Sequence, residues 1–85
     1  MKKMRIKFTS CEQVLQFIDC VQGLPGEYDL VEGKNDIDAK SMLGVFSLDF
    51  SKALTLVVYD DEEYPWVMDK LAAFEFKAPV FQQIG

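Results

Sequence analysis

The sequence predicts an α+β domain in which three helices cover one face of a four-stranded antiparallel sheet. Several short segments alternate apolar and polar residues, others repeat apolar residues at helical spacing, and their order along the chain is β-α-β-β-α-β-α. Each predicted strand has one apolar face, so packing the helices there leaves the other face in water. The 85 residues allow one domain. We place it at residues 1–76, with 77–85 as a C-terminal tail.

The first predicted strand spans residues 3–8, where apolar even positions alternate with basic odd positions. A helix follows over residues 10–21. Ser10 with Gln13 three residues later is typical of a capping box, so Ser10 is the predicted N-cap. The predicted apolar face of this helix consists of Cys11, Val14, Leu15, Ile18 and Val21.

Residues 27–32 and 36–40 are predicted to be short strands of a hairpin turning at residues 33–35. A short helix is predicted within residues 41–48, with Ser41 as its N-cap. The segment 53–59 is rich in β-branched residues and is the strongest strand pattern in the chain.

The last helix is predicted to open at Asp60 and Asp61, with Pro65 tolerated in its first turn. Its predicted apolar face consists of Tyr64, Val67, Met68, Leu71 and Ala72, with Phe74 or Phe76 at the end.

Composition narrows the classes of function. Fourteen acidic residues against nine basic ones give a net charge of −5, which argues against nonspecific binding to nucleic acid or anionic lipid. No run approaches the roughly 18 apolar residues of a membrane span. Cys11 and Cys20 would lie about 13.5 Å apart along one helix, so we expect free thiols and a cytoplasmic protein. With two cysteines as the soft ligands and no histidine, we expect no structural zinc site. We also expect no cofactor.

The segment 40–48, Lys-Ser-Met-Leu-Gly-Val-Phe-Ser-Leu, carries a family resemblance. It is similar to the Lys-Ser-Ile-Met-Gly-Val-Met-Ser-Leu segment around the regulatory serine of HPr (histidine-containing phosphocarrier) proteins of the phosphotransferase system. The resemblance runs from the first strand to about Phe74. It implies the family's fold, an open-faced β-sandwich with three helices over a four-stranded antiparallel sheet.

The residues that carry phosphate in that family are missing here. Ungapped counting from Ser41 places the family's active histidine at Ser10, its arginine at Glu12 and its proline at Gln13. A serine phosphate is a stable ester, and Glu12 would repel a phosphate, so we predict no phosphohistidine relay. The alternative is a diverged phosphocarrier that accepts phosphate on Ser10 or Cys11. A plain N-cap at Ser10 and a buried or half-buried structural cysteine at Cys11 are the simpler expectations.

Ser41 matches the serine that a dedicated kinase phosphorylates in some members of the family, creating a docking surface for a transcriptional regulator. A subgroup of the family keeps this serine without the histidine and acts only in catabolite regulation, as the resemblance implies for this chain. The simpler alternative is that Ser41 only caps its helix.

Met42, Leu43 and Phe46 are the predicted partner-binding residues, because a short helix that is apolar all round must have something covering it. In the resembling family, the outer residues of this segment contact partner proteins. The alternative cover is the C-terminal tail, through Val80, Phe81 and Ile84.

The remaining charges predict no enzyme. The carboxylates at positions 27, 29, 32, 36 and 38 form a solvated face without a convincing acid–base pair, and Lys3, Arg5 and Lys7 form a basic stripe on the first strand. The sequence therefore favours a non-catalytic regulatory or adaptor protein with protein partners. A fold relic or dimeric binding domain of unrelated function is a further alternative.

Overall fold

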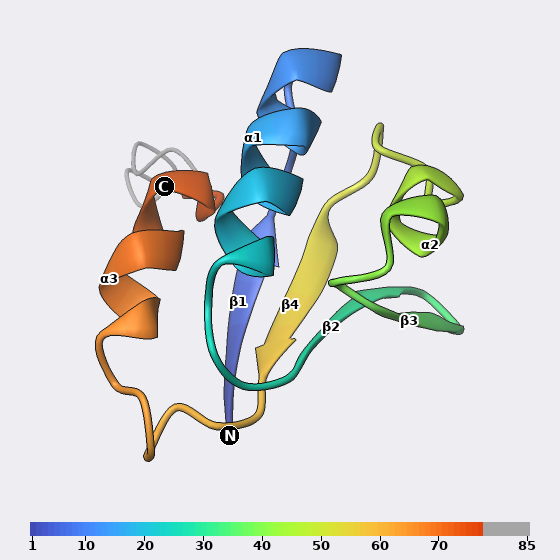
Figure 1. Cartoon of the computed structure of the whole chain (residues 1–85). Helices are drawn as coiled ribbons and strands as arrows, with labels where there is room; N and C mark the ends of the chain where they lie inside the picture. Colours follow the sequence, from blue (N-terminus) through green and yellow to red (C-terminus); the bar gives the residue numbers. More distant parts are fainter. Residues whose placement is uncertain (78–85) are drawn as a thin grey trace, which may run out of the picture.

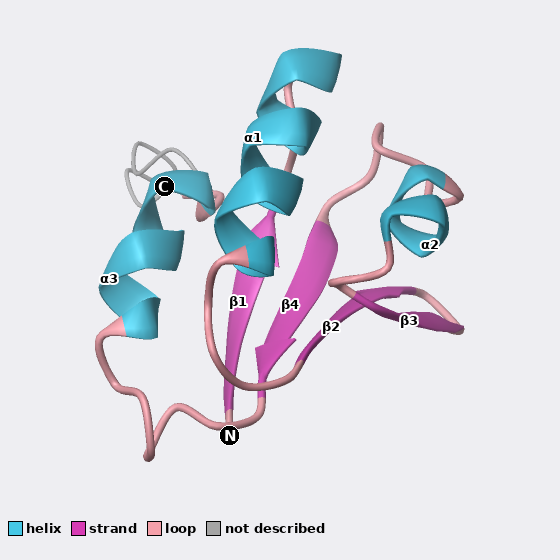
Figure 2. Ribbon diagram, viewed as in Figure 1, coloured by secondary structure: helices cyan, strands magenta, loops and turns pink. Residues whose placement is uncertain are grey.

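The computed structural model describes residues 1–77 and confirms the predicted α+β fold (Figure 1). Figure 2 shows the three helices on the same side of the four-stranded sheet. In chain order the elements are β1 (Lys2–Ile6), α1 (Cys11–Gln22), β2 (Tyr28–Glu32), β3 (Asn35–Asp38), α2 (Met42–Phe46), β4 (Leu54–Val58), α3 (Val67–Leu71) and the 3-10 turn η1 (Ala72–Phe74).

The sheet has the order β1-β4-β2-β3, and every neighbouring pair is antiparallel. Directly opposed residues share a face, so the row Met4, Leu56, Leu30 and Ile37 crosses the whole sheet beneath the helices. The first three members of this row are buried and Ile37 packs against them. A one-residue slip of any strand would move its residue of this row from the core to the solvent-exposed face. The cost of exposing that apolar side chain fixes the register.

Helix α1 begins as predicted but buries a different stripe. The Ser10 hydroxyl accepts a hydrogen bond from the Gln13 backbone N–H at 3.1 Å, which confirms the N-cap. The Gln13 side chain accepts from the Thr9 N–H, one residue earlier than a standard capping box. The buried residues are Val14, Phe17, Ile18 and Val21.

The predicted face of α1 was therefore wrong at Cys11 and Leu15, which are both exposed. Phe17 lies in the core instead, edge-on to Phe8 and Phe74 with ring centroids 5.3 and 5.4 Å away. The helix is oriented so that the large ring of Phe17 is buried. The rings that it contacts belong to other segments of the chain.

The last helix begins later than predicted. Helix α3 starts at Val67, and residues 59–66 form turns and a short connection. Pro65 disfavours helical backbone at the residue before it, so the helix cannot continue back through Tyr64. Asp60 is used as an acceptor for the Glu27 N–H at 2.8 Å, and Asp61 pairs with the Met1 amino group at 2.7 Å.

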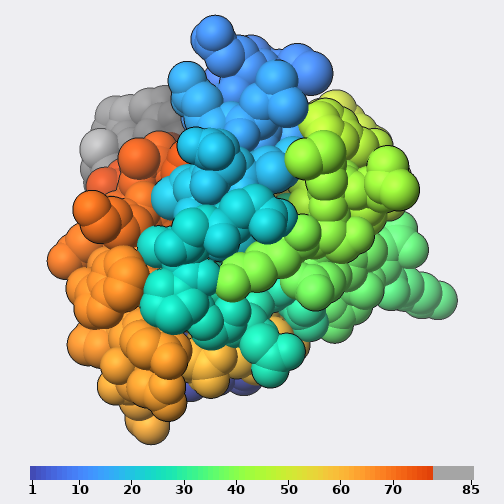
Figure 3. Space-filling view, viewed as in Figure 1, coloured from blue at the N-terminus to red at the C-terminus, as the bar shows by residue number. Residues whose placement is uncertain are grey.

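The exposed surface on the helix side is divided between the three helices. Figure 3 shows the residues of α1 in the middle, with those of α2 and α3 on opposite flanks. Within residues 1–77 no helix has the length and apolarity that a membrane crossing requires. The predicted tail, apart from Lys77, lies outside the described residues.

Gly26 provides a test of the local backbone. Its φ of +93° is in the region that favours glycine, and an added Cβ would lie 3.0 Å from the Asp60 carboxylate. We expect Gly26→Asn to lower the free energy of unfolding by about 1–3 kcal/mol in urea titrations. Gly33→Asn is the matched control, because φ is +57° there and the space is open. Equal losses for the two variants would contradict this account.

Candidate functional site

Ser10, which the sequence alignment predicts at the family's histidine position, caps helix α1. Ser10 is exposed at the start of α1, with extended backbone and its hydroxyl oxygen bonded to Gln13 N–H. Within residues 1–77 no ion pair brings a cation to this helix start, and the first-turn charge is the exposed Glu12. The site can stabilise a helix, but no ion pair among residues 1–77 supplies a basic side chain that would steady a phosphate there.

The two thiols lie in different surroundings. Cys11 is exposed, so the expectation of a buried or half-buried cysteine was wrong; the buried stripe of α1 begins at Val14 instead. Cys20 is half-buried against the core. Burial, with Asp19 nearby, raises the pKa of the Cys20 thiol. Cys20 is therefore a packed structural residue rather than an activated nucleophile.

Ser41 is the exposed N-cap of α2. Its hydroxyl accepts from the Gly44 N–H at 3.2 Å, and its own N–H donates to the Asp38 carbonyl at 2.9 Å. Nearby Lys40 points elsewhere, because its ammonium donates to the Leu24 carbonyl and lies over the Tyr28 ring. The Ser41 hydroxyl is therefore exposed to solvent, and the Lys40 ammonium does not contact it.

Met42, Leu43 and Phe46 form an exposed apolar surface, which we call the α2 patch. Their exposed fractions are 53, 85 and 40%, while Val45 on the inner side of the helix is fully buried. Gly44 faces β3, where an added Cβ would lie 3.4 Å from Ile37. One side of α2 thus packs tightly and the other faces solvent. The alternative cover by Val80, Phe81 and Ile84 lies outside the described residues.

An aromatic chain ties the α2 patch to the core. Phe46 contacts Phe50 at 6.1 Å between ring centroids, Phe50 contacts Phe8 at 5.8 Å, and Phe8 leads on to Phe17 and Phe74. All four contacts are edge-on, an arrangement that contributes about 0.5–1.5 kcal/mol each beyond area burial. The exposed Phe46 ring is therefore held in place rather than free to fold away.

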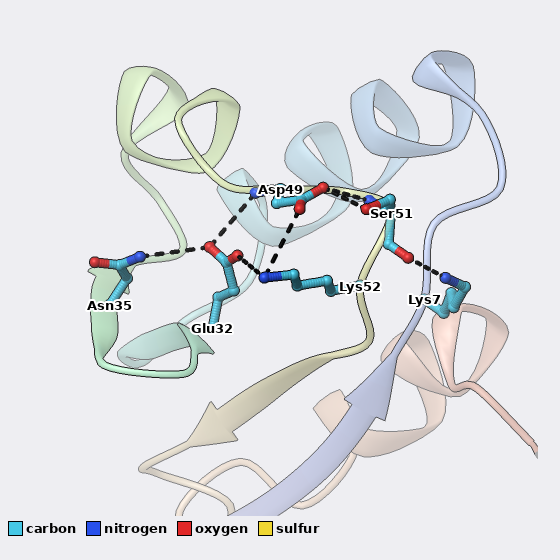
Figure 4. Close-up of polar contacts among 6 residues, drawn as sticks. All are labelled: Lys7, Glu32, Asn35, Asp49, Ser51 and Lys52. Carbon is cyan, nitrogen blue, oxygen red and sulfur yellow. Dashed lines mark hydrogen bonds and ion pairs between the residues drawn. The ribbon is translucent and has the colours of Figure 1, made fainter.

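A polar network fixes the loop that leaves α2 (Figure 4). The Asp49 carboxylate accepts from the Ser51 N–H at 2.9 Å and from its hydroxyl at 2.6 Å, and Lys7 donates to the Ser51 carbonyl. Lys52 lies between Glu32 and Asp49 at 3.9 and 4.0 Å. This loop therefore connects β1 and the β2–β3 hairpin to the exit of α2.

Of the predicted acidic face, Asp29, Asp36 and Asp38 lie on the open side of the sheet. Glu32 does not, because it alternates with Asp29 along β2 and pairs with Lys52 on the helix side. Tyr59 donates to Asp29 at 2.7 Å, which raises the pKa of Tyr59 to about 12. A hydrogen bond with Asp29 also raises the pKa of Asp36. The contribution of Tyr59 was missed from the sequence, because nothing local indicates that it reaches a strand 30 positions earlier. Residues 1–77 show no cluster of three metal-binding side chains.

Comparison with known proteins supports the fold. Compared by sequence, the chain matches no protein-family model and no characterised protein. In structure it is similar to HPr-C-His from Thermoanaerobacter tengcongensis, with a TM-score of 0.66 over 94% of this chain and 100% of that one. The two are 19% identical. The fold is therefore HPr-like.

The Asp49 hydrogen bonds predict a pH-dependent contribution to stability. Its bonds with Ser51 hold the pKa of this carboxyl below the ordinary value. A lowered folded-state pKa stabilises the protein above the unfolded pKa, and the contribution is lost as the pH falls through the folded pKa. We expect Asp49→Asn to melt at a lower temperature than wild type at pH 7 and the difference to shrink below about pH 4. A difference that stays constant with pH would contradict this assignment.

Proposed function

We propose that this chain is a non-enzymatic regulatory or adaptor protein of the HPr family that binds protein partners through the α2 patch and carries no phosphohistidine relay. The observation that carries the proposal is the combination of an HPr-like fold, a chain without histidine, and an exposed apolar patch on α2. Apolar patches held in place on small domains are typical of protein-binding surfaces.

The chemistry at the start of α1 supports the loss of the relay. A relay needs a nitrogen nucleophile and positive charge to steady the phosphate. Here the corresponding hydroxyl oxygen of Ser10 caps the helix, and Glu12 is the neighbouring charge. Diverged phosphotransfer through Ser10 or Cys11 has weaker support, although Cys11 is exposed. A fold relic or dimer of unrelated function leaves the anchored patch unexplained.

Ser41 is the proposed control point of the patch. Phosphate on this hydroxyl would add a charge of about −1.5 to −2 one residue before Met42, at the edge of the α2 patch. It would thereby convert an apolar surface into one that an arginine-bearing partner prefers. The partner classes are a serine kinase and a transcriptional regulator, and the proposed location is the cytoplasm.

A serine kinase of the HPr family tests the control point. With ATP, we expect it to add one phosphate, seen by intact-mass spectrometry, that Ser41→Ala loses. Ser47→Ala is the matched control, because Ser47 is an exposed serine at the other end of the same helix. Phosphate retained in Ser41→Ala, or none in the wild type, would contradict control at Ser41.

The same reaction tests the patch, because the kinase must dock beside Ser41. We expect Leu43→Ser to lower kcat/KM for phosphorylation by about tenfold or more, the effect of losing one well-packed contact residue. Leu15→Ser is the matched control, since Leu15 is a half-exposed leucine on α1. Circular dichroism would establish that both variants fold. Equal effects of the two variants would show that the α2 patch is not the docking surface.

A further inference from the structure

The open face of the sheet, opposite the helices, is divided by charge. Lys3 and Arg5 on β1 point to this face at one edge of the sheet, and Asp36 and Asp38 on β3 point to it at the other. All four side chains are exposed. The α2 patch belongs to the helix side, so this surface is independent of the proposed partner-binding surface.

The register arranges these charges in two parallel rows across the four strands. One row runs Lys3, Val57, Asp29 and Asp38. The other runs Arg5, Thr55, Val31 and Asp36. Each row therefore begins with a cation and crosses uncharged residues. The row of Lys3 ends with two carboxylates, and the row of Arg5 ends with one.

These charges form no ion pairs within residues 1–77, although Asp29 accepts a hydrogen bond from the Tyr59 hydroxyl and Asp38 accepts one from the Lys40 N–H. The ion pairs among residues 1–77 join Met1 to Asp61 and Lys52 to Glu32 and Asp49, and none involves the two rows. Asp29 instead lies near another carboxylate, that of Asp36, and raises the pKa of the Asp36 carboxyl. The acidic end thus has an excess of negative charge that a cation from outside the chain can neutralise.

We propose that the open faces of two copies of this chain pair with each other about a two-fold axis parallel to the strands. Such an axis places each row opposite the same row of the other copy, with the order of the strands reversed. Arg5 of one copy therefore meets Asp36 of the other, and Lys3 meets Asp29 and Asp38. Both contacts occur twice, as in an isologous interface. The sheets remain nearly aligned, which is a common way for sheets to stack.

A hollow of about 250 Å³ can receive the Lys3 side chain of the second copy. It is lined by Glu27, Tyr28, Asp29, Asp38 and Tyr59. This is the acidic end of the row that begins with Lys3. The long stem of Lys3 can cover apolar surface while its ammonium reaches the carboxylates.

The dimer is weak and reversible. Four strands about 4.8 Å apart and about 17 Å long offer about 330 Å² per copy. The total of about 650 Å² is below the roughly 1,200 Å² of a stable interface. The net charge of −5 on each copy opposes association at long range. At 0.15 M salt the Debye length is about 8 Å, so salt screens this long-range repulsion more strongly than it screens the direct contacts between the paired charges.

Sedimentation equilibrium at about 0.15 M salt tests this pairing, with protein up to about 1 mM. We expect the average mass of the wild type to rise with concentration toward that of a dimer. Arg5→Glu and Asp36→Lys should each weaken association about tenfold or more, since each sets like charges against one another. An equimolar mixture of these two variants should associate again, because the altered charges are complementary.

Lys70→Glu is the control, since it changes the net charge as Arg5→Glu does, but Lys70 is an exposed residue of α3 on the helix side. It should associate like the wild type. A wild type that stays monomeric at 1 mM, a Lys70→Glu variant as impaired as Arg5→Glu, or a mixture that does not associate would each overturn the proposal.

Discussion

The α2 patch depends on the edge-on contact between Phe46 and Phe50. Helix α2 has only five residues, too few to be stable without tertiary contacts. Val45 and the Phe46–Phe50–Phe8 contacts hold it to the core, and the Asp49–Ser51 loop holds its exit. Because these contacts hold α2 in place, the apolar side chain of Leu43 stays exposed instead of folding back onto the domain.

The two sides of the sheet have different physical characters. The helix side buries apolar rows and ends in an exposed apolar patch. The open side carries cations at the β1 edge and carboxylates at the β3 edge. Ser41 lies close to the acidic edge, since its N–H donates to the Asp38 carbonyl. Asp36 points to the open face, on the side of the sheet opposite α2, so it does not share the surroundings of Ser41.

Local signals in the sequence predicted most of the fold. Alternation at residues 3–8, the turn at 33–35 and the β-branched segment 53–59 predicted the four strands to within about two residues. The N-caps Ser10 and Ser41 were correct because a cap depends on its own next three residues. The open-faced arrangement followed from strands with a single apolar face.

Features that depend on distant contacts were not predicted. The orientation of α1 follows from the two rings that contact Phe17. These are Phe8, in the connection between β1 and α1, and Phe74, in η1. The late start of α3 follows from Pro65 and from the use of Asp60 to bind the Glu27 N–H. For the site, the sequence indicated the α2 patch and Ser41, but not the aromatic chain or the Tyr59–Asp29 hydrogen bond.

The central claim is that this HPr-like fold has lost phosphorelay chemistry. The most direct measurement is intact-mass spectrometry after incubation with phosphoenolpyruvate and the relay enzyme that phosphorylates HPr proteins, with an HPr that contains the active histidine as the positive control. The account predicts that the positive control gains phosphate and this chain gains none. Acid-labile or thiol-linked phosphate on this chain, lost in Ser10→Ala or Cys11→Ala, would contradict it.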